Sequence, residues 1–416
     1  MNGASDGPRL GVDQGVTREI NRGIVLGLIR SDGPLSRAAI ARRAGLAKGT
    51  VSSVVEQLIA AGVVAETGQG TSAPSGGRPG RLVSFNPTSR HLVGIAIGAR
   101  QTSVIVTDAL GDTLLRRNAK TPAATPERVL AAAGRLVRRA VSETAATNDS
   151  IAAVGVVVPG IVDPRTSVCL LAPNLGWHDV AVRDLIAAEL TASPAPIFVH
   201  NTAQAVAVAE ACEGAAVGHE DVACVYASIG IGAGMLRHGQ VVLGSGGVAG
   251  ELGHCVVPGG DRRCNCGNTG CLETLVSGPA IERTAAEAVA RGDNTTLAGL
   301  GRDPTARDVA AAAASGDAIA GAIIGDAARL LGVATSWLVN ITNPSMVVVA
   351  GGLAEIGAPL LEPMGTELRR HAVAQAVGGL QVRASALGAD GPIRGAVLLA
   401  RQYADEHFRS VFRSNS

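Results

Sequence analysis

One histidine and three cysteines between residues 250 and 273 have the types and spacing that bind a soft divalent metal. His254 lies ten positions before Cys264, and Cys264, Cys266 and Cys271 fall within eight residues. One imidazole and three thiolates form a closed tetrahedral set, which is typical of a structural zinc site because no position stays open for chemistry. The sequence therefore predicts a structural zinc ion held by these four side chains. Three unrelated thiols acting as small apolar residues are the alternative.

Two acidic residues flank the predicted ligands. Glu251 lies three residues before His254, and Glu273 lies two residues after Cys271. A metal that fixes the loop also fixes these carboxylates. An ionised carboxylate only accepts hydrogen bonds, so a rigid pair of them suits vicinal sugar hydroxyls. The stretch thus predicts a sugar site beside the metal.

The order Gly-His, ten steps to Cys-x-Cys-Gly-x-x-Gly-Cys-x-Glu resembles the signature of the ROK family of repressors, open reading frames and sugar kinases. The resemblance covers essentially the whole chain. It implies a winged helix-turn-helix followed by a two-lobed α/β fold of the actin-like ATPase type. It also implies a set of sugar contacts: Asn174, Asn201, Glu251, His254 and Glu273. Ordinary turn residues are the alternative for the two asparagines, and Trp177 is expected either to close over a sugar face or to pack in the core.

The resemblance implies that kinase chemistry is lost. Ala96 stands where ROK kinases have the Asp that helps to hold magnesium, and Thr202 stands where they have the general base. A threonine hydroxyl does not act as a base near neutral pH, and a general base contributes about 10²–10⁴ in rate. We therefore expect a protein that is not an enzyme and does not depend on ATP. An ATP-dependent sugar kinase with a DNA-binding head is the rival hypothesis.

The first 90 residues differ in charge from the remainder. They carry eleven Lys or Arg against six Asp or Glu, a net charge of +5, within a chain whose total is +1. A basic head on a mildly acidic body indicates that the head meets a polyanion. Periodicity and turn residues predict helices at about 17–31, 37–44 and 48–61, then strands at 63–66 and 81–85.

That order of elements is typical of a winged helix-turn-helix, in which the third helix enters the DNA major groove. Ser36 is expected to cap the second helix, and Gly45 to end it. A Gly-Arg-Pro wing, as in ROK repressors, would place an extended Arg in a narrow minor groove. The predicted DNA contacts are Arg37, Lys48, Thr50, Ser52, Ser53 and Arg78. A small helical protein-interaction domain is the alternative.

The body alternates strands with Ala-rich helices, which favours an α/β architecture. Glycine-punctuated strand pairs are expected at 92–107 and 222–236, and a buried strand at 346–353. The expected helices lie at about 126–145, 182–190, 203–213, 278–291, 306–315 and 318–340. The expected domains are a flexible arm (1–15), the winged helix-turn-helix (16–87), a first lobe (88–200 with a C-terminal helix at about 393–410) and a second lobe (201–392) that contains the zinc loop (254–271).

Composition limits the cellular setting. Hydrophobic residues make up 47% and charged residues 17%, which is typical of a globular protein. No apolar run reaches the roughly 18 residues that cross a membrane, and the first residues lack a basic and apolar signal sequence. Clustered thiols with metal spacing fit a reducing compartment. The sequence therefore predicts a cytoplasmic protein.

Together these features predict a sugar-responsive, DNA-binding transcriptional regulator, specifically a repressor. Its expected partners are a palindromic operator in double-stranded DNA, a sugar or sugar-derivative effector, and further copies of itself in a homodimer or dimer of dimers, because helix-turn-helix proteins usually read two half-sites. A ligand-independent repressor that receives its signal from a partner protein is the second rival.

Overall fold

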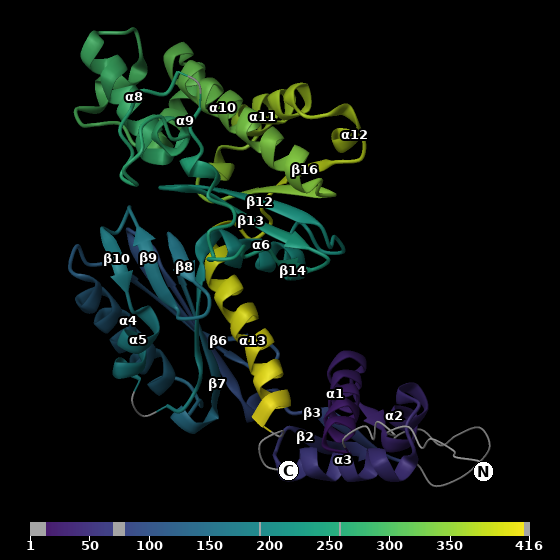
Figure 1. Ribbon diagram of the computed structural model, residues 1–416. Helices are drawn as coiled ribbons and strands as arrows, with labels where there is room; N and C mark the ends of the chain where they lie inside the picture. The colour runs from purple at the N-terminus through teal and green to yellow at the C-terminus, as the bar shows by residue number, and fades with distance from the viewer. Residues whose placement is uncertain (1–13, 70–79, 191–192, 258, 412–416) are drawn as a thin grey trace, which may run out of the picture. The chain divides into compact units, whose positions relative to one another are not determined.

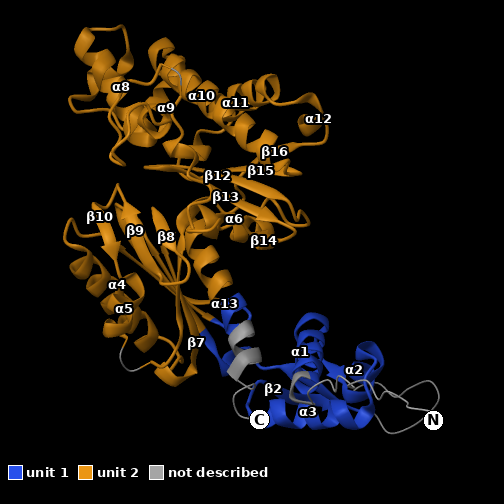
Figure 2. Ribbon diagram, viewed as in Figure 1, with its two compact units in different colours: residues 1–91, 108–112, 401–416 blue, residues 92–107, 113–400 orange. Residues whose placement is uncertain are grey.

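A computed structural model describes residues 14–69, 80–190, 193–257 and 259–411. The chain divides into two compact units (Figure 2). One unit comprises the described parts of residues 1–91, 108–112 and 401–416, and the other comprises those of 92–107 and 113–400. Residues 1–13 of the predicted arm (1–15) and Arg78 lie outside the described residues, and residues 14 and 15 begin the first helix.

The first unit has the element order of a winged helix-turn-helix, which confirms the prediction. Ser36 Oγ accepts a hydrogen bond from the Ala39 amide at 3.2 Å, and Gly45, with φ of 65°, ends the second helix as expected. The described elements are α1 (Gln14–Asp32), β1 (Leu35–Ser36), α2 (Arg37–Ala44), α3 (Lys48–Ala60), β2 (Val64–Gln69) and β3 (Arg81–Phe85). The strands pair in the order β1-β3-β2.

A small apolar core holds these elements together. Ile29 of α1, Ile40 of α2 and Leu58 of α3 are almost fully buried, and Val83 of β3 closes the core from the sheet side. Burying side chains of this size stabilises a fold by roughly 1.5–3 kcal/mol each. The core fixes α3, whose opposite face remains exposed.

Two five-stranded sheets organise the second unit (Figure 1). The first, in the order β11-β7-β4-β5-β6, contains β4 (His91–Ile97), β5 (Gln101–Asp108), β6 (Thr113–Lys120), β7 (Ile151–Val158) and β11 (Ile197–Asn201). The second, in the order β14-β13-β12-β15-β16, contains β12 (Val222–Ala227), β13 (Ile231–Arg237), β14 (Gln240–Val241), β15 (Met346–Ala350) and β16 (Gln381–Ala384). A small sheet adds β8 (Ile161–Asp163), β9 (Val168–Ala172) and β10 (Trp177–Val180).

We call the first sheet with its helices the first lobe and the second sheet with its helices the second lobe. The helices of the first lobe are α4 (Pro126–Ser142) and α5 (Val182–Glu189). Those of the second are α7 (Glu273–Val276), α8 (Gly278–Arg291), α9 (Ala306–Ala314), α10 (Ala318–Thr342), α11 (Ala358–His371) and α12 (Ala374–Val377). Single turns of 3₁₀ helix lie at 87–89, 148–150, 252–254, 296–300, 354–356 and 388–390.

The strand β15 shows why the second sheet is covered on both faces. All five of its residues are buried, and alternate side chains enter different cores. Val347 and Val349 pack with α10 and α11, whereas Met346 and Val348 pack with α6 (Thr202–Glu213). A strand buried on both faces reads as a continuous apolar run, which is the pattern that predicted it.

The helix α10 has the length and mean hydropathy of a membrane span. Many of its apolar residues nevertheless pack inside the second lobe, where Ile324, Leu331 and Val339 are almost fully buried. It packs lengthwise against α11. These contacts identify α10 as the core helix of a folded lobe.

The C-terminal helix α13 (Gly391–Val411) lies against the first sheet. Its approach to β7 is so close that a Cβ added at Gly155 would overlap the Ala396 carbonyl oxygen. Leu398 and Leu399 join α6 in the core between the lobes. A glycine in β7 is therefore what lets α13 pack here.

This contact gives a stability prediction. Gly155→Ala is expected to destabilise the protein by about 1–3 kcal/mol, because the new methyl group overpacks the interface with α13. Gly321→Ala in α10 is the matched control, since nothing lies within 4 Å of a Cβ there; it should stabilise by about 0.5–1 kcal/mol. Thermal and denaturant unfolding measure both. Equal stability of Gly155→Ala and the native chain would contradict the packing described.

Candidate functional site

A cavity of about 360 Å³ lies within the second unit, a volume typical of small-molecule sites. It is lined from the first lobe by the turn after β4 and from the second lobe by the turn after β12. All five predicted sugar-contacting residues line it, namely Asn174, Asn201, Glu251, His254 and Glu273. The structure thus brings together side chains that are up to 99 positions apart in the sequence.

Glu273 is anchored at the base of this cavity. It begins α7, is only 9% exposed, and accepts a hydrogen bond from the Ile231 amide at 2.8 Å. The Asn174 side chain also hydrogen-bonds its carboxylate. Burial raises the pKa of Glu273, and these two donors oppose that rise by favouring the charged form.

Glu251 shares the cavity with Glu273. Burial, and then the charge of Glu273, raise the pKa of Glu251 to about 7. A carboxyl group with such a pKa both donates and accepts hydrogen bonds near neutral pH. Together with the carboxylate of Glu273, this group suits the paired hydroxyls of a sugar.

The imidazole of His254 connects this carboxyl pair to the thiols. His254 ends the 3₁₀ turn Leu252–His254. Its Nδ1 lies 3.7 Å from Cys264 Sγ, and its Nε2 lies 3.7 Å from Glu251 Oε2. One ring nitrogen therefore faces the thiols, and the other faces the cavity.

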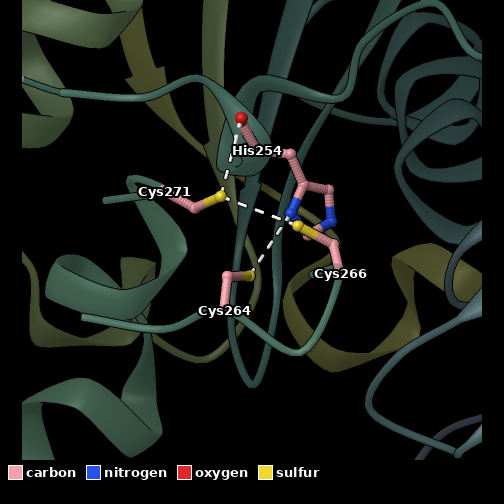
Figure 3. A group of neighbouring side chains, drawn as sticks. All are labelled: His254, Cys264, Cys266 and Cys271. Carbon is pink, nitrogen blue, oxygen red and sulfur yellow. Dashed lines mark hydrogen bonds between the residues drawn. The ribbon is translucent and has the colours of Figure 1, made fainter. Parts of the chain in front are cut away.

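The predicted metal ligands form one compact group (Figure 3). The ligand atoms of His254, Cys264, Cys266 and Cys271 all lie within 4.8 Å of one another, and the Sγ atoms of Cys266 and Cys271 are 3.7 Å apart. Sulfurs about 2.3 Å from a shared tetrahedral ion are separated by about 3.8 Å, whereas a disulfide requires about 2.05 Å. The group can hold a metal ion.

The local chain makes this grouping possible. Gly267 and Gly270 have φ of 102° and 81°, which are values that a side chain disfavours, and they turn the chain tightly between Cys266 and Cys271. The Arg262 guanidinium binds both carboxylate oxygens of Glu287 on α8 at 2.9 Å. The ion pair fastens the loop to the second lobe.

The pKa values of two of the thiols are raised, and a bound cation would lower them. Burial, together with the neighbouring thiols, raises the pKa of Cys271 to about 12, and burial also raises that of Cys264. A bound divalent cation reverses such a shift, because it coordinates the thiolate directly. The donor set therefore fits a soft divalent metal.

Asn201 has a structural task that the sequence did not reveal. Its Oδ1 accepts from the Ala203 amide at 2.7 Å and caps α6, while its Nδ2 donates to the Gly160 carbonyl at 2.6 Å. These bonds leave one N–H of the amide for a ligand. Thr202 follows as the first residue of α6 and lines the cavity, as does Ala96 of β4.

Trp177 packs in the core and does not line the cavity. It is 1% exposed and belongs to the apolar core of the first lobe. Of the two alternatives for this residue, the structure supports packing.

The predicted DNA contacts differ in their surroundings. Lys48 and Ser53 of α3 are exposed, and Thr50 and Ser52 are half-buried. Arg37 instead forms ion pairs with Glu66 at 3.2 Å and Glu56 at 3.5 Å, so its guanidinium already has partners within the head. These contacts tie α2 to α3 and β2, an arrangement that sequence spacing does not show.

Sequence reasoning also missed a cation in the cavity. Arg100, in the turn between β4 and β5, lines the cavity and lies 3.6 Å from Glu282 of α8. Its position within a glycine-punctuated turn was the available indication. Tyr226 of β12 lines the cavity as well.

Two family models match the chain. Residues 92–403 match the model described as ROK family, and residues 19–65 match one described as winged helix-turn-helix DNA-binding. The matches cover the body and the head respectively, and they confirm the fold expected from the sequence.

Individual proteins of two kinds resemble the chain. A putative xylose repressor of Caldicellulosiruptor sp. (strain Rt8B.4) is 32% identical over 387 residues, which are 89% of this chain and 94% of the relative. A glucokinase of Halalkalibacterium halodurans is 34% identical over 254 residues, 60% of this chain and 76% of the relative. Among solved structures, a ROK family transcriptional regulator described as a homolog of the E. coli MLC protein has a TM-score of 0.81 and 26% identity, covering 96% of this chain and 100% of its own.

Proposed function

The chain belongs to the ROK family, and from this premise we propose that it is a sugar-responsive transcriptional repressor that has lost kinase chemistry and contains a structural zinc ion. One observation carries the proposal. A winged helix-turn-helix is joined to a sugar-kinase-like body whose cavity keeps the hydroxyl-binding carboxyl groups but has Ala96 and Thr202 at the positions that catalysis requires. Such a regulator acts in the cytoplasm, where its operator lies.

The first turn of α3 supports the DNA-binding role. Ala47 precedes this helix and provides no side-chain cap, so the first backbone N–H groups of α3 remain available to donate to an outside acceptor. Lys48 adds a positive charge at the same helix end. A helix N-terminus with exposed amides and a lysine suits a DNA phosphate. A homodimer would present two such helices to the half-sites of a palindrome.

A DNA-binding measurement tests the two halves of this proposal separately. On DNA from upstream of its own gene, Lys48→Ala is expected to weaken binding and to lower the salt slope by about 1, because one phosphate contact is lost. Lys120→Ala is the control, since Lys120 is the only other lysine and is exposed on β6 of the body. Glu251→Ala should keep DNA affinity but lose its response to the sugar, which we expect to be about fivefold or more in the native protein.

Fluorescence anisotropy with a panel of sugars measures these effects. Tight DNA binding that no sugar changes, in the native protein as in Glu251→Ala, would favour the ligand-independent repressor. Unchanged DNA affinity in Lys48→Ala would contradict the placement of α3 at the DNA.

The absence of a carboxylate at positions 96 and 202 supports the proposed loss of kinase activity. Thr202 begins α6 beside the capping Asn201, and its hydroxyl is too weak a base to take a proton from a sugar hydroxyl. Ala96 has no oxygen with which to hold magnesium. The carboxyl groups that do line the cavity, Glu251 and Glu273, are suited to binding hydroxyls.

ADP release provides the direct test against the kinase hypothesis. With ATP, magnesium and each sugar of the panel, the native protein is expected to release ADP no faster than a protein-free control. Thr202→Asp should not restore full activity, because Ala96 still lacks the magnesium carboxylate. Sugar-dependent ADP release by the native protein would establish the kinase instead.

The four-ligand group supports zinc as a structural ion. Three thiolates and one imidazole fill a tetrahedral shell, so a bound zinc would have no open position for chemistry. Its task would be to fix the loop that carries His254 between the two carboxyl groups. Part of the folding free energy would then depend on the metal.

Metal analysis of a cysteine variant tests this assignment. The native protein is expected to contain one zinc per chain, and Cys266→Ser should lose the zinc together with about 3 kcal/mol or more of stability. Cys212→Ser is the control, because Cys212 is exposed and lies outside the group. Full metal content and an unchanged melting temperature in Cys266→Ser would contradict the assignment.

A further inference from the structure

The described chain passes between the two lobes at two places. The first passage is α6, which follows β11 of the first sheet and precedes β12 of the second. The second passage is the segment 385–390, which follows β16 of the second sheet and leads into α13. The helices α6 and α13 lie side by side (Figure 1), so closely that a Cβ added at Gly395 of α13 would overlap the Ala205 carbonyl oxygen of α6. A movement of one lobe relative to the other therefore changes the backbone at both passages.

A fully buried carboxylate joins the two passages. Glu210 of α6 is 0% exposed and accepts a hydrogen bond from the Ala215 amide at 2.7 Å. From the second passage it accepts hydrogen bonds from the Ser385 hydroxyl and from the Ala386 and Leu387 amides, both amides at 3.2 Å. A carboxylate only accepts hydrogen bonds, so it matches a shell made entirely of donors. Burying such a group is costly unless its oxygens are bonded in this way.

The hydrogen bonds of Glu210 continue to the cavity. The Ser385 hydroxyl, which donates to Glu210, accepts a hydrogen bond from the Gly388 amide at 2.8 Å. Gly388 lines the cavity, as do Pro392 and Ile393 of α13. Glu210 is not among the described residues that line it. The carboxylate thus holds one wall of the cavity from behind and does not touch a ligand there.

A second carboxylate of α6 extends the tie to α13. Glu213 accepts two hydrogen bonds from the Arg394 guanidinium, at 2.6 and 2.7 Å. Two parallel bonds of this kind fix the geometry of an ion pair as well as contributing energy. Arg394 directly follows the cavity-lining Ile393. The segment 385–394 is therefore tied to α6 at both ends, by Glu210 at its start and by Glu213 at its end.

From these contacts we infer that Glu210 is a positioning residue for effector binding, which makes the two passages between the lobes move as one hinge. The inference rests on the proposed sugar-sensing function of the cavity. When the effector draws the lobes together, the bonds of Glu210 keep Gly388 at the cavity wall and pass the movement of α6 to α13, whose end belongs to the head unit. Without these bonds each passage would bend independently, and effector affinity and the response of the head would both fall.

Two substitutions at the tie test the inference in the full-length protein. Glu210→Gln keeps the shape of the side chain but turns an amide N–H₂ toward other donors, and Ser385→Ala removes the hydroxyl that links Glu210 to Gly388. Calorimetry measures the affinity for glucose, N-acetylglucosamine and xylose, and fluorescence anisotropy measures DNA affinity with and without each sugar. Both variants are expected to bind the sugar that the native protein senses about fivefold or more weakly. Their DNA affinity should change less on addition of that sugar, while their DNA affinity without sugar stays at the native value.

Two control variants separate positioning from stability. Ser385→Thr keeps the hydroxyl at a half-buried position, so it should restore the native sugar affinity and response. Ser336→Ala removes a buried hydroxyl that donates to the Val333 carbonyl at 2.6 Å within α10, outside both passages. It should lower the melting temperature about as much as Ser385→Ala does and leave sugar affinity unchanged. All affinities are compared at a temperature at which the melting curves show every variant to be folded.

The outcomes separate this inference from the proposed function. If the native protein responds to a sugar, and Glu210→Gln and Ser385→Ala lower only the melting temperature, the role of Glu210 is merely structural and the inference is wrong while the sugar-sensing proposal stands. The inference is also wrong if Ser336→Ala loses sugar affinity to the same extent, or if Ser385→Thr does not keep it. If Glu210→Gln does not fold, Ser385→Ala decides between these results. If no sugar binds the native protein or changes its DNA affinity, the proposed function fails, and the inference fails with it.

Discussion

Three thiols, two of them buried and one half-buried, and an imidazole have ligand atoms that all lie within 4.8 Å of one another, and this grouping imposes the constraint on which the cavity depends. As thiolates they would repel one another, and burial already raises the pKa of Cys271 and Cys264. A shared divalent cation satisfies all four groups at once. The loop that it would hold carries His254, whose other ring nitrogen faces Glu251 in the cavity. In the proposed function, the geometry of the carboxyl groups in the cavity would therefore follow from metal coordination by the loop.

The cavity explains how one fold can serve both enzymes and regulators. Recognition of hydroxyls needs fixed acceptors, and Glu251 and Glu273 are fixed by the loop and by the Ile231 amide. Phosphoryl transfer additionally needs a base and a magnesium carboxylate, and Thr202 and Ala96 provide neither. We therefore propose that the residues at these two positions separate binding from catalysis while the scaffold is kept. The similarity to both a xylose repressor and a glucokinase agrees with this division.

Local patterns predicted most of the elements. The helices of the head, the strand β15 and the long helix α10 follow from apolar periodicity, caps and turn residues, and their ends agree within a few residues. The cysteine spacing similarly predicted a group that the structure brings together.

Contacts between distant residues were not predictable in this way. The capping role of Asn201, the ion pairs of Arg37 and the Arg100–Glu282 pair each depend on elements that only the fold makes neighbours. The strands β6 and β7 and the helix α11 were also missed; β6 is mostly polar, and Pro363 interrupts the helical pattern of α11. The head unit takes in residues 108–112 and the end of α13, a grouping set by tertiary contacts.

The most direct test of the account is the affinity of the effector measured by calorimetry with and without saturating operator DNA. If cavity and head are coupled, DNA must change effector affinity by the same factor by which the effector changes DNA affinity, about fivefold or more. Effector that binds with identical affinity in the presence and absence of the operator would show that the cavity does not regulate DNA binding.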